Sequence, residues 1–520
     1  MNSLYHAYIS GEDRVADLYE ALPASLFRDR HSPAPFPPAM AEQVNRYQQQ
    51  LGVEKTDLPP QCRVIITGQQ AGLFGGSLYT VYKTITAIQL AERVSRPDAP
   101  VIPLFWTASD DHDFEEINHA TLVTRRHDLL TLRYTPSPAD GYVKGMPAGE
   151  IPLTGQLNKL IDQAAAVTPS SECTEEIRDF LIRALGESAS VAEWFSRIQA
   201  RLFARTALRL FDPRLPAARR TAAAILEQEI EAPLESTALL MRQGDILESR
   251  GFGRPIRRTE TMCNFFLEIE KIRCTMFYEN GRFHAPEAER SFSKPEMKAL
   301  LAARPELFSG NVALRPIIQQ ALFPVLAYVA GPGEIAYWAQ LKPLFNLFDQ
   351  PMPIVYPRMK GLITTLKNNK LRKRFSADTT QPFDLNQVLT RALEQEHANR
   401  YHNAFQKGRI SLDDAFAHFL APFLAPGTPA AVQQLAQRFQ KNQQFYFDRF
   451  GKALLFSDQE KRKTVENQLT RLHCFFSPNG KEQERALSLF SFLFEQGWPL
   501  IDRMLDVFSP DKTGVQEFEL

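Results

Sequence analysis

The stretch that decides the fold runs from Val64 to Lys83 and reads VIITGQQAGLFGGSLYTVYK. It opens with an apolar, β-branched run, breaks into a glycine-rich segment and continues with apolar residues at helical spacing. A second stretch, Val101–His119, reads VIPLFWTASDDHDFEEINH and turns from an apolar run into acidic residues. Buried parallel strands that deliver a site at their carboxyl ends have this form. Together the stretches predict an enzyme core built as strand, glycine-rich loop, helix, strand and acidic loop.

Composition narrows the class of protein. The chain has 520 residues, enough for two to four domains, and 44% of them are hydrophobic, as in ordinary globular proteins. Lys plus Arg and Asp plus Glu both number 60, so the formal net charge is zero and nucleic acid is not an expected partner. Apolar runs stop short of membrane-spanning length and MNSLYHAYISGEDR lacks a signal-peptide pattern, so we expect a cytoplasmic protein without membrane association.

Cysteine usage argues against disulfides and zinc. The chain has five cysteines, an odd number for a disulfide framework, and none forms a Cys-x-x-Cys pair. We therefore expect reduced thiols and no zinc, and we assign no residue to a metal site.

Two domains are predicted. Residues 1–376 form an α/β core, with the strand–helix–strand unit at 64–107, an inserted helical and β-hairpin region at about 130–310, and a return to the sheet at 311–376. Asn280-Gly281 between apolar runs indicates a hairpin turn inside the insertion. The returning segment carries a Gly-Pro-Gly before a helix and a short strand in PIVYPRMK, 353–360. Residues 377–520 form a helical domain.

The helical domain contains an apolar series at alternating three and four spacing. Its members are Val432, Leu435, Phe439, Asn442, Tyr446, Phe450 and Ala453, of which Asn442 is the most polar. The series predicts a long helical hairpin or short coiled coil. Such an element pairs two subunits or packs within its own chain, and we expect a homodimer.

The glycine-rich loop is a candidate anion site. Gly68, Gly72, Gly75 and Gly76 lie between a strand and a helix N-terminus, where free N–H groups favour phosphate or carboxylate. The spacing matches neither GxGxxG nor the P-loop pattern. Gln69 and Gln70 suit hydrogen bonds to a sugar or amide, and Lys83 points at the ligand or at water. The alternative is a tight structural turn.

The acidic loop is a candidate catalytic segment. Asp110, Asp111, His112 and Asp113 follow a buried strand, with Glu115, Glu116, Asn118 and His119 close behind. So many carboxylates need a cation, N–H groups or a ligand amine nearby. The loop suits binding a substrate ammonium, removing an amine proton, or holding Mg²⁺ on nucleotide phosphates. The alternative, an acidic helix N-terminus, explains Glu115 and Glu116 well but the earlier residues poorly.

A third cluster lies near the returning strands. Arg358 and Lys360 are placed to meet phosphate, whereas the cations from Lys367 to Arg374 suit a solvated helix face. Gly333 and Glu334 mark a helix start, and Glu334, Tyr337 and Trp338 suit orienting a base or sugar. Core packing is the alternative for these aromatic residues.

These segments resemble the cysteine ligase of bacillithiol biosynthesis, the BshC family. The matching blocks are ITGQQAGLFGGSLYTVYK, PLFWTASDDHDFEEINH, ALRPIIQQALFPVLAYVAGPGEIAYWAQL, PIVYPRMK and QERALSLFSFLFEQG. The resemblance implies a Rossmann-like parallel-sheet core with connecting-peptide insertions and a C-terminal coiled coil that forms a homodimer. The implied reaction joins cysteine to glucosaminyl-malate through an amide bond in the last step of the pathway. The synthetase motif His-x-Gly-His is absent from GQQAGLFGG, so its histidine roles are not carried over.

Amide formation from a carboxylate requires activation, and we expect ATP as co-substrate, alone or with Mg²⁺. Two other functions are consistent with the sequence. One is a different amide-forming ligase or nucleotidyl transferase of the same fold, and the other is a non-catalytic coiled-coil scaffold of the pathway. The crowded acidic loop argues against the scaffold.

Overall fold

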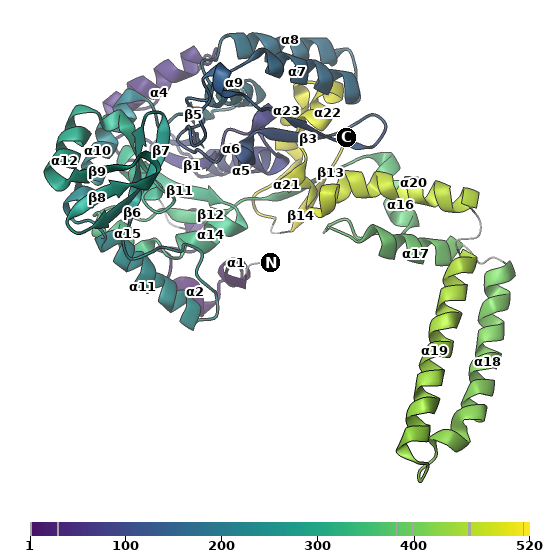
Figure 1. The fold of residues 1–520 in the computed structure, drawn as a ribbon. Helices are drawn as coiled ribbons and strands as arrows, with labels where there is room; N and C mark the ends of the chain where they lie inside the picture. Colours follow the sequence, from purple (N-terminus) through teal and green to yellow (C-terminus); the bar gives the residue numbers. More distant parts are fainter. Residues whose placement is uncertain (1–2, 29–30, 381, 397–399, 456–458, 513) are drawn as a thin grey trace. The chain divides into compact units, whose positions relative to one another are not determined.

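The computed structural model describes residues 3–28, 31–380, 382–396, 400–455, 459–512 and 514–520. The chain divides into two compact units (Figure 1). Unit 1 comprises residues 1–363, 484–518 and 520, and unit 2 comprises residues 364–483 and 519. This division differs from the predicted one in two ways: the first unit ends at residue 363 and not at 376, and residues 484–518 return to it after the helical segment.

A five-stranded parallel sheet with the order β12-β11-β1-β2-β5 forms the centre of unit 1. Its strands are β1 (Arg63–Gln69), β2 (Val101–Thr107), β5 (Arg209–Phe211), β11 (Val325–Ala330) and β12 (Ile354–Pro357). From β1, the chain adds β2 and β5 on one side and β11 and β12 on the other. The order therefore reverses between β1 and β11, which is where open parallel sheets bind ligands. The predicted Rossmann-like core is confirmed.

Helix α5 (Leu78–Val94) connects β1 to β2 and packs on both strands. Its apolar face, which includes Val81, Ile85 and Ile88, is buried. Further along, Ala87 and Leu90 join Ile65 of β1 in a core cluster on the same side of the sheet. A helix buried over most of its length holds the two site-bearing strands rigidly.

The region predicted as an insertion, about 130–310, contains β5, which is a strand of the main sheet. The insertion is therefore divided into a part before β5 and a part after it. Before β5 come α6 (Phe114–Ile117), β3 (His119–Val123), β4 (Leu129–Arg133), α7 (Gly155–Val167), α8 (Cys173–Gly186) and α9 (Val191–Leu202). After it come α10 (Pro216–Glu231), α11 (Glu235–Ser249), β6 (Met262–Ile269), β7 (Ile272–Glu279), β8 (Arg282–Ala285), β9 (Arg290–Ser293), α12 (Lys294–Ala303) and β10 (Phe308–Gly310). Strands β10-β6-β7-β8-β9 form a second, antiparallel sheet. Asn280 and Gly281, with φ of 51° and 78°, turn β7 into β8, so the predicted hairpin is confirmed.

Short elements complete unit 1. The N-terminal segment forms α1 (Ser3–Ile9), α2 (Asp13–Ala16), α3 (Ser25–Arg28) and α4 (Pro38–Gln50). Around β11 and β12 lie α13 (Arg315–Leu322), α14 (Pro332–Trp338), α15 (Lys342–Leu347) and β13 (Lys360–Thr364). The C-terminal segment adds α21 (Gln483–Ala486), α22 (Phe490–Gln496), α23 (Pro499–Val507) and β14 (Val515–Glu519), which pairs with β13.

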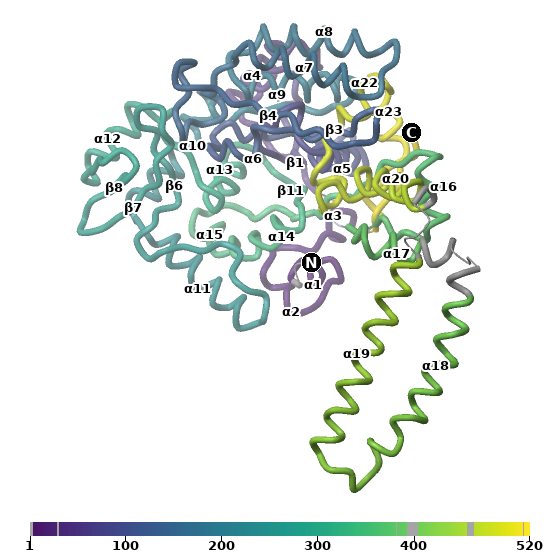
Figure 2. Tube along the Cα trace, turned by 45° about the vertical axis from the view of Figure 1, so that its right-hand side comes forward, coloured from purple at the N-terminus to yellow at the C-terminus, as the bar shows by residue number. Residues whose placement is uncertain are grey.

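Unit 2 is helical, as predicted. Its elements are α16 (Leu366–Arg374), α17 (Leu385–Glu396), α18 (Arg400–Leu424), α19 (Ala430–Leu455) and α20 (Gln459–Phe476). Helices α18 and α19 run side by side as an antiparallel hairpin (Figure 2). The predicted apolar series on α19 is largely exposed in the single chain, with Leu435 at 67%, Tyr446 at 61% and Phe450 at 55%. Within the described ranges, no helix has both the length and the hydropathy to cross a membrane.

Candidate active site

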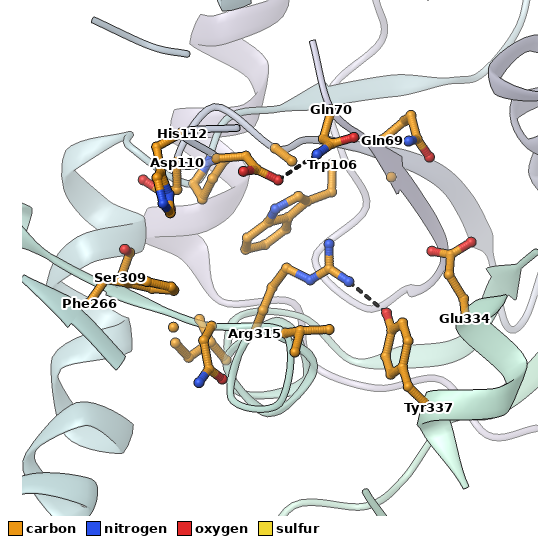
Figure 3. A pocket seen from close by; sticks show the side chains of 18 of the residues that line it. Gln69, Gln70, Trp106, Asp110, His112, Phe266, Ser309, Arg315, Glu334 and Tyr337 are labelled. Carbon is orange, nitrogen blue, oxygen red and sulfur yellow. Dashed lines mark hydrogen bonds between the residues drawn. The ribbon is translucent and has the colours of Figure 1, made fainter. Parts of the chain in front are cut away.

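A pocket of about 730 Å³ lies at the carboxyl ends of β1, β2 and β11, where the strand order reverses (Figure 3). The end of β1 contributes Gly68 and Gln69, the next residue is Gln70, and the segment after β2 contributes Asp110, Asp111 and His112. The opposite wall comes from the antiparallel sheet and from α13. The glycine-rich and acidic segments therefore share one crevice, as predicted.

Direct bonds hold the two segments together. Gln70 Nε2 donates to Asp111 Oδ2 over 2.8 Å, and the Ala108 amide donates to the Gln69 carbonyl over 3.0 Å. Gly68 is required where β1 approaches β2, because a Cβ at this position would lie 2.7 Å from the Trp106 carbonyl oxygen. The short apolar strands thus set the site geometry through close backbone packing.

Asp110 is a neutralised carboxylate. Its side chain pairs with Arg219, and Arg214 Nη1 lies 3.8 Å from the same oxygen. Burial raises the pKa of Asp110, but the guanidinium groups of Arg219, Arg214 and Arg273 outweigh burial and hold it below its usual range. Asp110 was predicted to be catalytic, and the structure places it against two arginines.

His112 is a neutral hydrogen-bond donor in this geometry. Burial and the nearby charge of Arg273 lower the pKa of His112, so its ring is uncharged at neutral pH. Arg273 Nη1 lies 3.4 Å from His112 Nδ1. A guanidinium can only donate, so Nδ1 is the acceptor and the proton resides on Nε2. Nε2 is therefore suited to donate to a carbonyl oxygen rather than to accept a proton.

Asp111 is the carboxylate available for substrate. Oδ2 accepts the bond from Gln70, and Oδ1 accepts a bond from the Asp113 amide over 3.1 Å. No cationic group in the described part of the chain lies within 4.0 Å of it. Asp113 itself is exposed and does not line the pocket, so its contribution is the backbone turn that orients Asp111. A carboxylate with spare lone pairs and no cation suits a substrate ammonium or an amine proton.

Lys83 lines the pocket, but its ammonium group is already paired with a carboxylate of the protein. Its side chain is 1% exposed, and Nζ donates to Glu334 Oε2 over 2.7 Å, to the Gly68 carbonyl over 2.6 Å and to Gln69 Oε1 over 3.4 Å. Glu334 also accepts bonds from Tyr328 and the Gly331 amide. Burial raises the pKa of Glu334, but Lys83 outweighs it and keeps the carboxylate ionised. The pair joins α5 to α14, and the Lys83 bonds to Gly68 and Gln69 connect both to the end of β1.

Arg358 and Lys360 do not form the predicted phosphate-binding loop. Arg358 lines the pocket, but its guanidinium makes a bidentate pair with Glu484 at 2.9 and 2.5 Å, and both side chains are buried. Lys360 begins β13, and its Nζ lies 5.5 Å from the ring centroid of Tyr5, outside the pocket lining. The basic loop is absent from this part of the described chain because only Arg358 and Met359 separate β12 from β13.

The later glycines form the tight structural turn that was the alternative prediction. Gly75 and Gly76 adopt φ of 74° and 78°, and the Gly75 carbonyl accepts a bond from Gln199 Nε2 over 3.1 Å. Phe74 stacks edge-on against Trp194. With Gly72, these glycines lie outside the pocket lining.

Four other predicted residues also lie away from the pocket. Asn118 Oδ1 accepts a bond from Arg133 Nη1 over 2.9 Å, and His119 begins β3. Trp338 is 1% exposed and packs on Tyr328 in the core. These residues and Glu116 are not among those that line the pocket, whereas Gly333, Glu334 and Tyr337 are.

Sequence reasoning missed most of the opposite wall. The residues it missed include Arg219, Arg258, Phe266, Arg273, Ser309 and Arg315, and on the sheet side it missed Trp106 of β2. Most of them come from the inserted region, far from either motif in the sequence. One signal was present, because Arg315 is the one charged residue in the largely apolar segment NVALRPIIQQALFPVL. A charged residue in such a segment is rarely buried without a functional or structural partner.

Fold and pocket define an α/β protein with a Rossmann-like sheet, an inserted antiparallel sheet and a helical hairpin domain. The domain described as "Bacillithiol biosynthesis BshC, N-terminal Rossmann-like domain" matches residues 1–359, and the "C-terminal coiled-coil domain" of the same family matches residues 362–518. The chain therefore belongs to the BshC family of bacillithiol biosynthesis.

Similar proteins carry the name "Putative cysteine ligase BshC". One from Bacillus cytotoxicus is 31% identical over 85% of this chain and 81% of its own length. One from Geobacillus kaustophilus is 31% identical over 86% and 82%, and one from Symbiobacterium thermophilum is 29% identical over 90% and 87%. A solved chain described as a putative arginyl-tRNA synthetase of Campylobacter jejuni aligns at 12% identity over 89% of this chain and 98% of its own, with a TM-score of 0.22, too low to relate the folds.

Proposed function

We propose that this protein is a ligase that joins cysteine to glucosaminyl-malate through an amide bond, in the last step of bacillithiol biosynthesis. Membership of the BshC family and the names of its relatives support this proposal. The observation that carries it in the structure is Asp111, a carboxylate without a cationic partner beside the neutral ring of His112. An amide-forming site needs such a group, because only an un-ionised amine attacks a carboxyl carbon.

In the proposed reaction, Asp111 accepts a proton from the glucosamine amine as its nitrogen bonds to the cysteine carboxyl carbon. His112 Nε2–H donates to the carboxyl oxygen on which negative charge develops. Cleavage of the bond to the leaving group completes the amide. Both roles follow from the hydrogen bonds of the site, which leave the Asp111 carboxylate and His112 Nε2 available for substrate. The Asp110 carboxylate is paired with arginine and is not available.

ATP, alone or with Mg²⁺, is the proposed source of the leaving group, because a free carboxylate is a poor acyl donor. The cations predicted to meet its phosphates do not fit that role, since Lys83 and Arg358 are paired with carboxylates and Lys360 lies outside the pocket. We therefore assign no residue to the nucleotide. Among the described residues, no group of three His, Cys, Asp or Glu side chains could hold a metal ion.

We also propose that the protein is a cytoplasmic homodimer paired through α18 and α19. The exposed apolar residues of α19 give a face for a second copy. The described structure contains five free cysteines, which suits a reducing compartment.

The test incubates the purified chain with cysteine and glucosaminyl-malate, with and without ATP and Mg²⁺, and follows the amide product by mass spectrometry. We expect product from cysteine, in an ATP-dependent reaction, and none from the Asp111→Asn variant beyond a small residual rate. Serine and alanine in place of cysteine are the matched controls. Equal product from serine would point to a different ligase, and no product from a folded, substrate-binding protein would contradict the proposal.

A further inference from the structure

Three arginines of the pocket have no carboxylate partner. No carboxylate of the described residues lies within 4.0 Å of Arg258, Arg273 or Arg315. The pocket cations Lys83, Arg219 and Arg358 differ, because each pairs with its own carboxylate. A buried cation without a counter-charge costs free energy, which an anionic ligand can offset.

Arg315, the first residue of α13, projects into the middle of the pocket (Figure 3). Its Nη2 donates to the hydroxyl of Tyr337 over 2.8 Å. Its Nε is buried without a hydrogen-bond partner. A guanidinium held by one phenol, with no carboxylate beside it, keeps its charge for an anionic ligand in the pocket.

Arg273, on β7, is the most enclosed of the three, with 9% exposure. It donates to Ser309 Oγ over 2.9 Å and to the Gly310 carbonyl over 3.0 Å, and it lies 3.8 Å from the ring centroid of Phe266. Burial lowers its pKa to about 10, although Asp110 and Asp111 act in the opposite direction. These neutral partners fix the plane of the guanidinium without cancelling its charge.

Arg258 adds a third guanidinium. Its Nε donates to Asn264 Oδ1 over 3.1 Å, and Asn264 is itself held by Ser236 and Thr237. Neutral groups therefore hold the Arg258 guanidinium in place, as they do the Arg273 guanidinium. Asp111, on the segment after β2, is the pocket carboxylate without a cation. Unpaired positive charges therefore outnumber the unpaired negative charge among the described residues of the pocket.

We propose that Arg258, Arg273 and Arg315 form a subsite for a dicarboxylate. Resting on the proposed function, this subsite takes the malate part of glucosaminyl-malate and directs its amine toward Asp111. Planar guanidinium groups match carboxylates in bidentate geometry, and three of them balance two carboxylates with one positive charge left over. The apolar ring of Trp106 suits the short carbon chain between the carboxylates, while Phe266 supports the Arg273 guanidinium.

Phosphate would also bind arginine, but polyphosphate sites are typically built on backbone N–H groups of a glycine-rich loop. These arginines come from three separate segments instead, namely the approach to β6, β7 and the start of α13. The described geometry therefore favours separate carboxylates over one polyphosphate chain.

The experiment measures binding of L-malate to the purified full chain by calorimetry, with acetate and inorganic pyrophosphate as comparison ligands. We expect malate to bind more tightly than either. Arg315→Met and Arg273→Lys should each weaken malate binding by about tenfold to a hundredfold, the loss typical of a charge-assisted hydrogen bond. Arg257→Met, at an exposed neighbouring arginine, is the matched control and should bind malate like the wild type.

Absence of malate binding, or wild-type binding in both variants, would overturn the subsite. Pyrophosphate binding that is tighter and depends on the same arginines would assign them to phosphate instead. If circular dichroism shows that Arg273→Lys does not fold, the Arg315→Met variant provides the test. The Arg315 side chain is only partly buried, so its replacement is compatible with folding. Malate binding without amide synthesis would contradict the proposed function alone, and amide synthesis without malate binding would contradict the subsite alone.

Discussion

Gln70 Nε2 donates a hydrogen bond to Asp111 Oδ2 over 2.8 Å and thereby joins two loops that lie 41 positions apart in the chain. The bond leaves Asp111 oriented but not neutralised, since an amide carries no charge. Asp110, one position earlier, is paired with Arg219. Neighbouring carboxylates on one loop thus have different roles, set by the partner that each one meets.

Removing the charge of Asp111 should stop catalysis without unfolding the protein. Asp111→Asn keeps an oxygen that can accept from Gln70, but it removes the base, so we expect kcat to fall by about 10²–10⁴-fold. Asp113→Asn, at an exposed position on the same loop, is the matched control and should retain wild-type turnover. Turnover assays with thermal melts check both variants, and unchanged kcat in Asp111→Asn would remove this carboxylate from the mechanism.

His112 should make stability depend on pH. Burial and the charge of Arg273 hold its pKa below the ordinary value of 6.5, so the unfolded chain takes up a proton at higher pH than the folded one. In the window just below pH 6.5 the unfolded state binds more protons, and the free energy of unfolding therefore falls as pH falls.

His112→Gln should remove this contribution. Between about pH 7.5 and about pH 5 the variant should lose less stability than the wild type, measured by urea unfolding. His284→Gln on β8, outside the pocket, is the control and should follow the wild type. An identical loss in wild type and His112→Gln would show that His112 does not titrate in this window.

The Arg358–Glu484 pair should be structural. Both side chains are buried, at 4% and 5% exposure, so Glu484→Ala leaves an unpaired buried guanidinium and should cost about 3–5 kcal/mol of unfolding free energy. The exposed pair Arg205–Asp502 offers a contrast, and Arg205→Ala should cost less than about 1 kcal/mol. Denaturant unfolding measures both, and a Glu484→Ala loss no larger than that of the control would be evidence against a structural role.

The exposed face of α19 should hold two copies together. Leu435→Glu places a charge on an apolar position that is 67% exposed in the single chain, so we expect monomers by light scattering. Lys441→Glu, a charge change at an exposed polar position of the same helix, should leave the assembly unchanged. A wild-type chain that is already monomeric, or a dimeric Leu435→Glu variant, would exclude this face as the interface.

Much of the fold could be predicted because local patterns decide it. The strand–helix–strand unit follows from apolar runs and helical spacing, and the β7–β8 turn follows from Asn280-Gly281. β5 was not predicted, because three residues, Arg209–Phe211, carry too little pattern to mark a strand. The return of residues 484–518 to unit 1 was also missed, since no local signal says which unit a segment packs on.

The candidate site could be predicted only on its sheet side. Both loops follow strands whose carboxyl ends lie at one edge of a parallel sheet, so their meeting follows from the sequence. The role of each residue in these loops could not be predicted from the sequence, because it depends on partners that are distant in the chain. Lys83 and Arg358 are both cations near strand ends, yet Glu334 and Glu484 occupy them.

The order of residues alone determined that this chain forms a parallel α/β core with a polar crevice and a helical C-terminal domain, because periodicity and turn chemistry are local properties. Tertiary structure decided which ionised groups of the pocket keep an unpaired charge, because charge neutralisation depends on what lies within a few ångströms in space. That is why Asp111 and Arg315 remain available while Asp110 and Lys83 do not.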